Sequence, residues 1–298
     1  MYEIIKKDQT KKISIKKLDE KEKEKLHERY CEGFGIIDEY LINNVICDNV
    51  FVPLSQNSVN EYFQNYVKYI NPNLSDFPQR LNFLFLPHSS HILTFNIFEY
   101  WRKSNCYNPI LKSMNMNSSF DYLICFEKEF NIYKKNPRID VLFSNNKNMG
   151  IGIECKYSES YNSQNKKFNW DVLSEYLKME YLWHNLKNLK YFSNDLCQNK
   201  LEYRYFNITQ SIIYILALHY NFNQVCNNYF YVYLFYPSQF ANENNDYINE
   251  TKEFTNALKL DNVNFIYKSF YELISDLSNN IDTKDRDYIN YLKKRYII

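Results

Sequence analysis

Two carboxylates and one lysine stand out in neighbouring apolar segments of the sequence. Asp140 lies in "RIDVLF" (138–143), and Glu154 and Lys156 lie in "IGIECKY" (151–157). Both segments have the apolar, β-branched composition of strands, and the polar turn "SNNKNMG" joins them. We therefore predict a β-hairpin that carries all three charged side chains.

The turn determines which residues of the hairpin face one another. If it centres on Lys147, the numbers of facing residues sum to 294, and Asp140 lies opposite Glu154. Cross-strand neighbours are roughly 4.5–5.5 Å apart at Cβ, and two like charges at that distance are destabilising unless a positive charge compensates them. A divalent cation would supply that charge, and Lys156 on the same face would add to it.

Two convergent carboxylates offer the hard oxygen ligands that suit Mg²⁺, an ion that usually completes its shell with water and substrate phosphate. The Lys156 ammonium could stabilise charge on a phosphoryl oxygen or orient a hydrolytic water. The pattern therefore predicts metal-assisted phosphodiester hydrolysis, with Mg²⁺ as cofactor and Mn²⁺ as a substitute. Gly152, on the same face, would leave room for a substrate backbone.

The acid-x-lysine spacing alone carries little weight. It recurs at 19–21, 250–252 and 282–284, all in polar stretches. Only Glu154 and Lys156 end an apolar strand that follows another strand with an aspartate. The alternative is an exposed Glu–Lys face with Asp140 at the edge of a strand.

The composition excludes other classes of site. The chain has 298 residues, a formal net charge of +1 and four glycines. Four glycines placed as two distant pairs cannot form a P-loop or a dinucleotide-binding fingerprint. The net charge gives no overall positive field of the kind that attracts nucleic acid, although lysines cluster locally.

The cysteines and the apolar runs bear on where the protein resides. Seven cysteines without CxxC spacing predict reduced, buried thiols and a cytoplasmic protein. The first residues lack the apolar core of a signal peptide, and the apolar run at 212–218 is too short to span a bilayer. We therefore expect a soluble protein with no membrane association.

Apolar periodicity and capping residues predict the elements around the hairpin. Upstream, we expect a helix from Ser89 or Ser90 to about Lys103, with His88 and His91 in structural or capping roles at its start, and a strand at 122–133. Downstream, the expected elements are an amphipathic helix over 169–187, an apolar helix at 209–220 with Thr209 as its candidate cap, a buried central strand at 229–237, a strand at 263–267 that leads into "SFYELISDL", and a terminal helix from Asp285. These elements predict one α/β domain at 86–298 after a partly helical N-terminal extension at 1–85.

The hairpin resembles the PD-(D/E)xK nuclease superfamily, which has the restriction-endonuclease-like fold. "NPRIDVLF" is followed, thirteen residues after Asp140, by "IECK". Weaker similarity joins "HSSHILTFNIF" to the leading helix of a bacterial branch, "FEKEF" to its upstream glutamate strand and "TQSIIYILAL" to its glutamine-bearing helix. The resemblance covers about residues 86–270 and implies an αβββαβ core, with a mixed central sheet flanked by helices.

The resemblance also implies roles for individual residues. Asp140 and Glu154 would be metal ligands, Lys156 the catalytic amine, and Gln210 an active-site residue that orients water or contacts DNA. Glu127 would be the upstream acid and a further metal ligand.

Two alternatives to Glu127 stay open, namely Glu129 and Glu99. The chain departs from the pattern in two places. Ile139 stands where the name motif has proline, and the helix that carries the glutamine lacks an expected arginine, for which Arg204 could substitute.

The function that we expect is a metal-dependent endonuclease that hydrolyses DNA, with no cofactor besides the metal. The resemblance suggests a homodimer for cleavage of both strands. Two other functions stay open: a non-catalytic DNA-binding or assembly module that retains the fold, and a nuclease acting on RNA or branched DNA.

Overall fold

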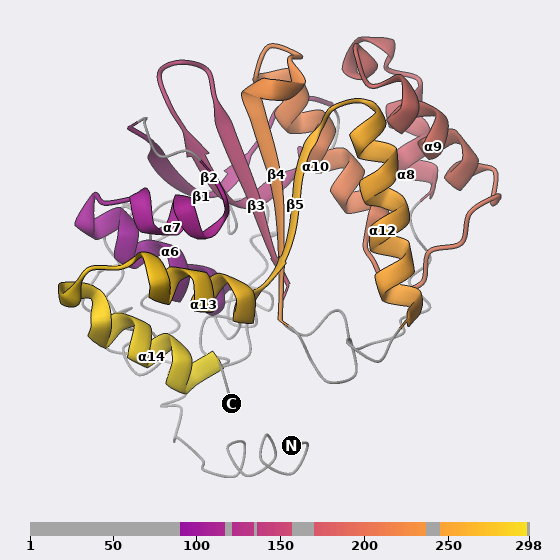
Figure 1. Ribbon diagram of the computed structural model, residues 1–298. Helices are drawn as coiled ribbons and strands as arrows, with labels where there is room; N and C mark the ends of the chain where they lie inside the picture. Colours follow the sequence, from indigo (N-terminus) through magenta and orange to yellow (C-terminus); the bar gives the residue numbers. More distant parts are fainter. Residues whose placement is uncertain (1–89, 117–120, 134–135, 157–169, 237–244, 297–298) are drawn as a thin grey trace, which may run out of the picture.

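A five-stranded sheet lies between two layers of helices in the computed structural model, which describes residues 90–116, 121–133, 136–156, 170–236 and 245–296 (Figure 1). One face of the sheet is covered by α6 (Ser90–Ser104), α7 (Asn108–Ser113), α13 (Phe270–Asn280) and α14 (Arg286–Tyr296). The other face is covered by α8 (Trp170–Leu177), α9 (Lys187–Cys197), α10 (Ile208–Asn221) and α12 (Asn245–Leu260). The predicted α/β class is confirmed, whereas the extension at 1–85 lies outside the described residues.

The sheet joins an antiparallel half to a parallel half. Its strands follow chain order: β1 (Leu123–Glu129), β2 (Arg138–Ser144), β3 (Gly150–Lys156), β4 (Tyr229–Phe235) and β5 (Asn264–Ser269). β1, β2 and β3 are antiparallel, and β3, β4 and β5 are parallel. Short turns suffice for antiparallel neighbours, but parallel neighbours need crossovers, which here contain helices.

The hairpin of β2 and β3 has the predicted register. Val141 lies opposite Ile153 and Ser144 lies opposite Gly150, so the numbers of facing residues sum to 294 as expected. The Asn145 carboxamide oxygen accepts from the backbone N–H groups of Lys147 and Met149, which closes the turn.

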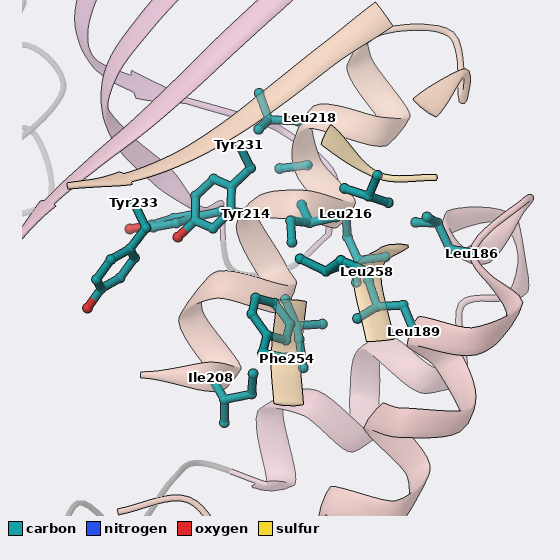
Figure 2. Close-up of a cluster of buried hydrophobic side chains, with 14 of the residues drawn as sticks. Leu186, Leu189, Ile208, Tyr214, Leu216, Leu218, Tyr231, Tyr233, Phe254 and Leu258 are labelled. Atoms are coloured by element: carbon teal, nitrogen blue, oxygen red, sulfur yellow. The ribbon is translucent and has the colours of Figure 1, made fainter. Parts of the chain in front are cut away.

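β3 is buried on both faces along its whole length. Ile151, Ile153 and Cys155 pack into the core beneath α6 and α13. The opposite side of the sheet packs against α10 and α12, where Leu218, Tyr231 and Phe254 belong to a second apolar core, shown in Figure 2. The predicted buried strand at 229–237 corresponds to β4, which spans Tyr229–Phe235, and residue 237 lies outside the described residues.

The expected single helix over 169–187 is wrong. The chain forms α8, a 3₁₀ turn at Glu180–Trp183 and then α9. Trp183 Nε1 donates to the Tyr176 carbonyl oxygen at 2.9 Å, and Asn185 adopts a positive φ of 62°. Asp261, distant in sequence, accepts from the backbone N–H groups that open α9, so a tertiary cap starts the new helix.

The expected cap of the apolar helix is also wrong. Asn207, rather than Thr209, caps α10, because its side-chain oxygen accepts from the backbone N–H of Gln210. Thr209 is already inside the first turn. α7 and α12 were not predicted from the sequence.

Cys106, Cys125, Cys155, Cys197 and Cys226 form no disulfide bond with one another. Only Cys155 among these five is buried, so the expectation of buried thiols is wrong for the other four. No helix in the described ranges is both long and apolar enough to cross a membrane.

Gly152 does not provide open space, contrary to expectation. A Cβ built at Gly152 would lie 2.4 Å from Ile139 Cδ1 and 2.8 Å from Leu218 Cδ1. The glycine lets α10 pack closely onto β3, so its role is in the core.

Replacing Gly152 with alanine should destabilise the fold. Overpacking of this kind costs about 1–3 kcal/mol, and each kcal/mol lowers Tm by roughly 2–4 °C in a chain of this size. Thermal unfolding followed by circular dichroism would measure the loss, with Asn146→Ala in the exposed turn as the control. An unchanged Tm for Gly152→Ala would mean that the space beside β3 is open after all.

Candidate functional site

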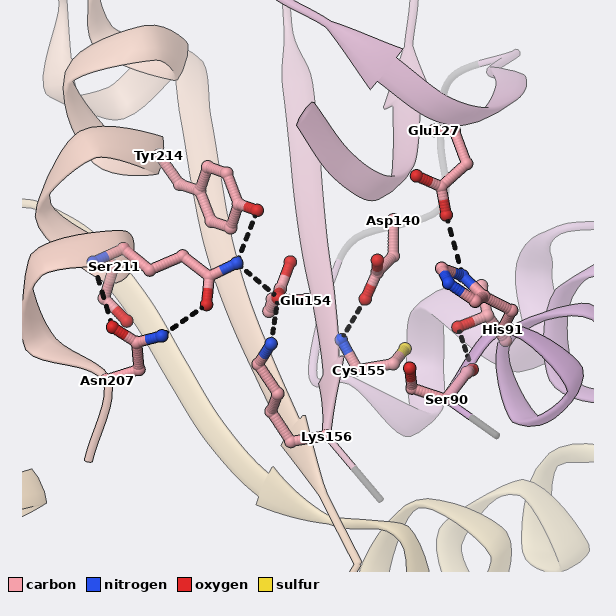
Figure 3. A network of polar contacts seen from close by, with 12 residues as sticks. Ser90, His91, Glu127, Asp140, Glu154, Cys155, Lys156, Asn207, Ser211 and Tyr214 are labelled. Atoms are coloured by element: carbon pink, nitrogen blue, oxygen red, sulfur yellow. Dashed lines mark hydrogen bonds and ion pairs between the residues drawn. The ribbon is translucent and has the colours of Figure 1, made fainter. Parts of the chain in front are cut away.

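The charged residues gather at one end of the sheet because of the strand directions. β1 ends, β2 begins and β3 ends at this end of the sheet, because neighbouring antiparallel strands run in opposite directions. The first turn of α6 approaches from one face and the first turn of α10 from the other (Figure 3). Two groups of polar side chains result, one on each side of β3.

The first group centres on Glu154. Its Oε1 atom lies 2.6 Å from Lys156 Nζ and accepts from Gln210 Nε2 at 3.1 Å. The Glu154 side chain is 2% exposed and that of Lys156 is 9% exposed, so this ion pair is largely removed from water. The predicted Glu154, Lys156 and Gln210 are therefore brought together.

The start of α10 holds the Gln210 side chain in place. Asn207 Nδ2 donates to Gln210 Oε1 at 2.8 Å, which orients the amide so that its nitrogen faces Glu154. Gln210 Nε2 also donates to the Tyr214 hydroxyl at 2.6 Å. Burial, together with the charge of Glu154, raises the pKa of Tyr214, so this hydroxyl stays protonated.

The second group consists of His91, Glu127 and Asp140. His91 Nδ1 lies 3.0 Å from Glu127 Oε1, and one ligand atom from each of the three residues lies within 4.8 Å of the others. Asp140 Oδ2 accepts from the backbone N–H of Cys155 at 2.7 Å. The β2–β3 pairing stops at Val141, so this carboxylate takes the place of a main-chain acceptor.

Glu127 reaches this group through an unusual backbone conformation. Its φ is 50°, between the ladder pairs Phe126–Val141 and Lys128–Ile139. A non-glycine residue in the left-handed region costs roughly 1–2 kcal/mol, so surrounding contacts must hold it there.

The two alternatives to Glu127 lie elsewhere. Glu129 accepts from Asn136 Nδ2 at 2.5 Å, and Glu99 is buried on α6 outside the group of three. Arg204, the expected substitute for the missing helix arginine, is exposed and pairs with Glu202. Of the three upstream acids weighed from the sequence, only Glu127 belongs to the group with Asp140.

His91 is the residue that sequence reasoning missed. It was expected to be structural or capping, yet its imidazole faces Glu127 and Asp140. Its position in the first turn of the helix before the three strands was a weak signal. The strand segments alone gave no indication that this turn lies beside them, and His88 lies outside the described residues.

The pKa values of Asp140 and His91 in the second group are both raised, for different reasons. Burial, reinforced by the negative charge of Glu127, raises the pKa of Asp140 to about 7, against the opposing effects of Lys156 and His91. For His91, burial lowers the pKa, but the charge and hydrogen bond of Glu127 outweigh it, so the pKa is raised. The group therefore favours a bound proton or cation.

The donor set of this group fits a metal ion. Two carboxylates and an imidazole converge from three elements, and each provides an atom that binds divalent cations. Glu154, predicted as a ligand, lies outside this group of three and pairs with Lys156 instead.

No protein-family model, curated protein or solved structure matches this chain.

Replacing Asp140 with asparagine should stabilise the metal-free protein at pH 8 but not at pH 4. The Asp140 pKa is about 7 in the folded state against an ordinary 3.8. As pH rises, Asp140 therefore loses its proton at a lower pH in the unfolded chain than in the folded protein. Wild-type stability therefore falls as pH rises between these values. The Asp140→Asn variant has no carboxyl group to deprotonate, so its stability does not fall in this way. Its side-chain oxygen can still accept the hydrogen bond from the Cys155 backbone N–H.

Thermal unfolding in EDTA across this pH range tests the effect. The Tm of Asp140→Asn should exceed that of the wild type by at least about 2 °C at pH 8, which corresponds to ~1 kcal/mol. Asp282→Asn, at an exposed position, is the matched control. A Tm difference that does not grow with pH would contradict the raised pKa.

Proposed function

We propose that this chain is a metal-dependent endonuclease that hydrolyses DNA phosphodiester bonds, with Mg²⁺ or Mn²⁺ as its cofactor. One observation carries the proposal: the buried Lys156–Glu154 ion pair lies on β3 beside the Asp140 carboxylate, which accepts from Cys155 between them in sequence. Metal-assisted phosphodiester hydrolysis needs two carboxylates and a lysine, and these groups lie together at one end of the sheet.

The order of elements supports the restriction-endonuclease-like αβββαβ core. α6, β1, β2, β3, α10 and β4 occur in this order along the chain, with α7 inserted before β1, and α8 and α9 inserted before α10. The three charged residues lie on the second and third strands of this succession, and Gln210 lies in the first turn of its second core helix. The resemblance of "NPRIDVLF" and "IECK" agrees with this order.

Asp140 and Glu127 would hold the metal ion, with Glu154 beside them. When bound, the ion would supply Lewis-acid polarisation of a phosphoryl oxygen and a lowered pKa of water. Lys156 places an ammonium in a nearly water-free environment, where it stabilises developing negative charge more strongly than it would in solvent.

Glu154 and Gln210 have positioning roles in this proposal. Lys156 and Gln210 both bind Glu154 Oε1, so the direction of this carboxylate is fixed. Asn207 and Tyr214 in turn fix the Gln210 amide. The arrangement enters the reaction pre-organised and needs little rearrangement of side chains.

Replacing Lys156 with glutamine should abolish most DNA cleavage while the protein still folds. Loss of one charge-stabilising donor lowers turnover about 100-fold or more. Lys156→Ala and Asp140→Ala would be assayed on duplex DNA with Mg²⁺ or Mn²⁺, beside Lys147→Ala in the exposed turn as the control. Lys156→Gln is included because its amide can still donate to Glu154 and so preserves folding.

Equal cleavage by the wild type, Asp140→Ala and Lys156→Ala would contradict the proposal. RNA and branched DNA are tested in parallel, and cutting confined to one of them would change the substrate but not the chemistry. DNA binding without cleavage and without divalent-metal binding would instead indicate a non-catalytic module. The dependence of cleavage on protein concentration would test the proposed homodimer.

A further inference from the structure

We propose that His91 is a metal ligand together with Glu127 and Asp140, and that this mixed nitrogen–oxygen site selects Mn²⁺ over Mg²⁺. The role of the metal in catalysis rests on the proposed nuclease function, whereas the binding site itself does not. The sequence led to a site of carboxylates alone and to Mg²⁺. The geometry of His91 points to a different ligand set.

The donor atoms of His91 and Glu127 are already separated as two ligands of one ion would be. Two neighbouring ligands of an octahedral ion, each at about 2.1 Å, lie roughly 3 Å apart. His91 Nδ1 and Glu127 Oε1 are already 3.0 Å apart. A cation can therefore replace the proton that these two atoms share, with little movement of either side chain.

The backbone of Glu127 is held in a strained conformation. A positive φ of 50° inside a strand has a conformational cost, and such strain tends to occur at functional sites. The strained residue contributes its carboxylate to the same group as His91 and Asp140. This observation is independent of the imidazole and indicates the same position for a ligand.

The Asp140 carboxylate is supported by a hydrogen bond from the main chain of β3. The Cys155 backbone N–H donates to Asp140 Oδ2 at 2.7 Å, which fixes the direction of this carboxylate. Hydrogen bonds of this kind orient metal ligands and tune their affinity. The His91 and Glu127 side chains are 14% and 8% exposed, so the site is shielded but reachable from solvent.

The choice of metal follows from the imidazole. Mg²⁺ is bound in proteins almost entirely through oxygen, whereas transition ions accept imidazole nitrogen readily. Mn²⁺ also accepts carboxylates and octahedral geometry, so it fits both kinds of donor present here. Loss of the nitrogen ligand should therefore weaken Mn²⁺ binding more than Mg²⁺ binding.

Electron paramagnetic resonance of Mn²⁺ bound to the full-length protein tests this directly. Pulsed measurements should detect coupling to an imidazole nitrogen in the wild type and none in His91→Gln. The Kd for Mn²⁺ should rise about 10-fold or more in His91→Gln, while the Kd for Mg²⁺ changes by less than about threefold. His184→Gln, at an exposed position, is the matched control and should retain both the coupling and the affinity.

The two glutamates provide a second matched pair. Glu127→Gln should weaken Mn²⁺ binding, whereas Glu129→Gln should not, because Glu129 is engaged with Asn136. Absence of nitrogen coupling in the wild type would overturn the proposal, whichever variants fold. Equal effects of Glu127→Gln and Glu129→Gln would also overturn it.

The nuclease assay separates this inference from the proposed function. If Mn²⁺ shows nitrogen coupling but the protein cuts no nucleic acid, the proposed metal site is supported and the proposed nuclease function is contradicted. If the protein cleaves nucleic acid with Mg²⁺ but bound Mn²⁺ shows no nitrogen coupling, the nuclease function is supported and His91 is not a metal ligand.

Discussion

Charge compensation inside a covered sheet is the constraint on which this structure depends. Three carboxylates meet at one end of a sheet whose faces are both packed with helices, and each needs a partner because ionised groups are costly away from water. Glu154 has Lys156 and the Gln210 amide, and Glu127 has His91. Asp140 receives a neutral backbone N–H and has a raised pKa, so an added cation would stabilise its ionised form.

The fold meets this constraint through the position of β3. This strand is antiparallel to β2 and parallel to β4, so it connects the hairpin half of the sheet to the crossover half. The hairpin half contributes Asp140 and Glu127, and the crossover half contributes the start of α10 with Gln210. Only at the end of β3 can side chains from both halves meet.

Local sequence patterns predicted the parts of the site that local chemistry determines. A polar turn centred on Lys147 was enough to give the register of β2 and β3, because side-chain parity and turn length leave few alternatives. The break after α8 escaped prediction because Asp261, far along the chain, caps α9. His91 escaped for the same reason, since its contact with Glu127 joins α6 to β1. No local pattern marked the positive φ of Glu127.

Three consecutive residues of β3 hold the two halves of the site together. The side chains of Glu154 and Lys156 form the group beside α10, while the main-chain N–H of Cys155 holds Asp140 in the other group. A slip of β3 by one residue would turn both charged side chains to the opposite face and remove that N–H from Asp140. The glycine at 152 lets α10 pack against the strand, and this contact keeps the first turn of α10, with Gln210, close to Glu154. The position of the charges is therefore set by the same packing that stabilises the core.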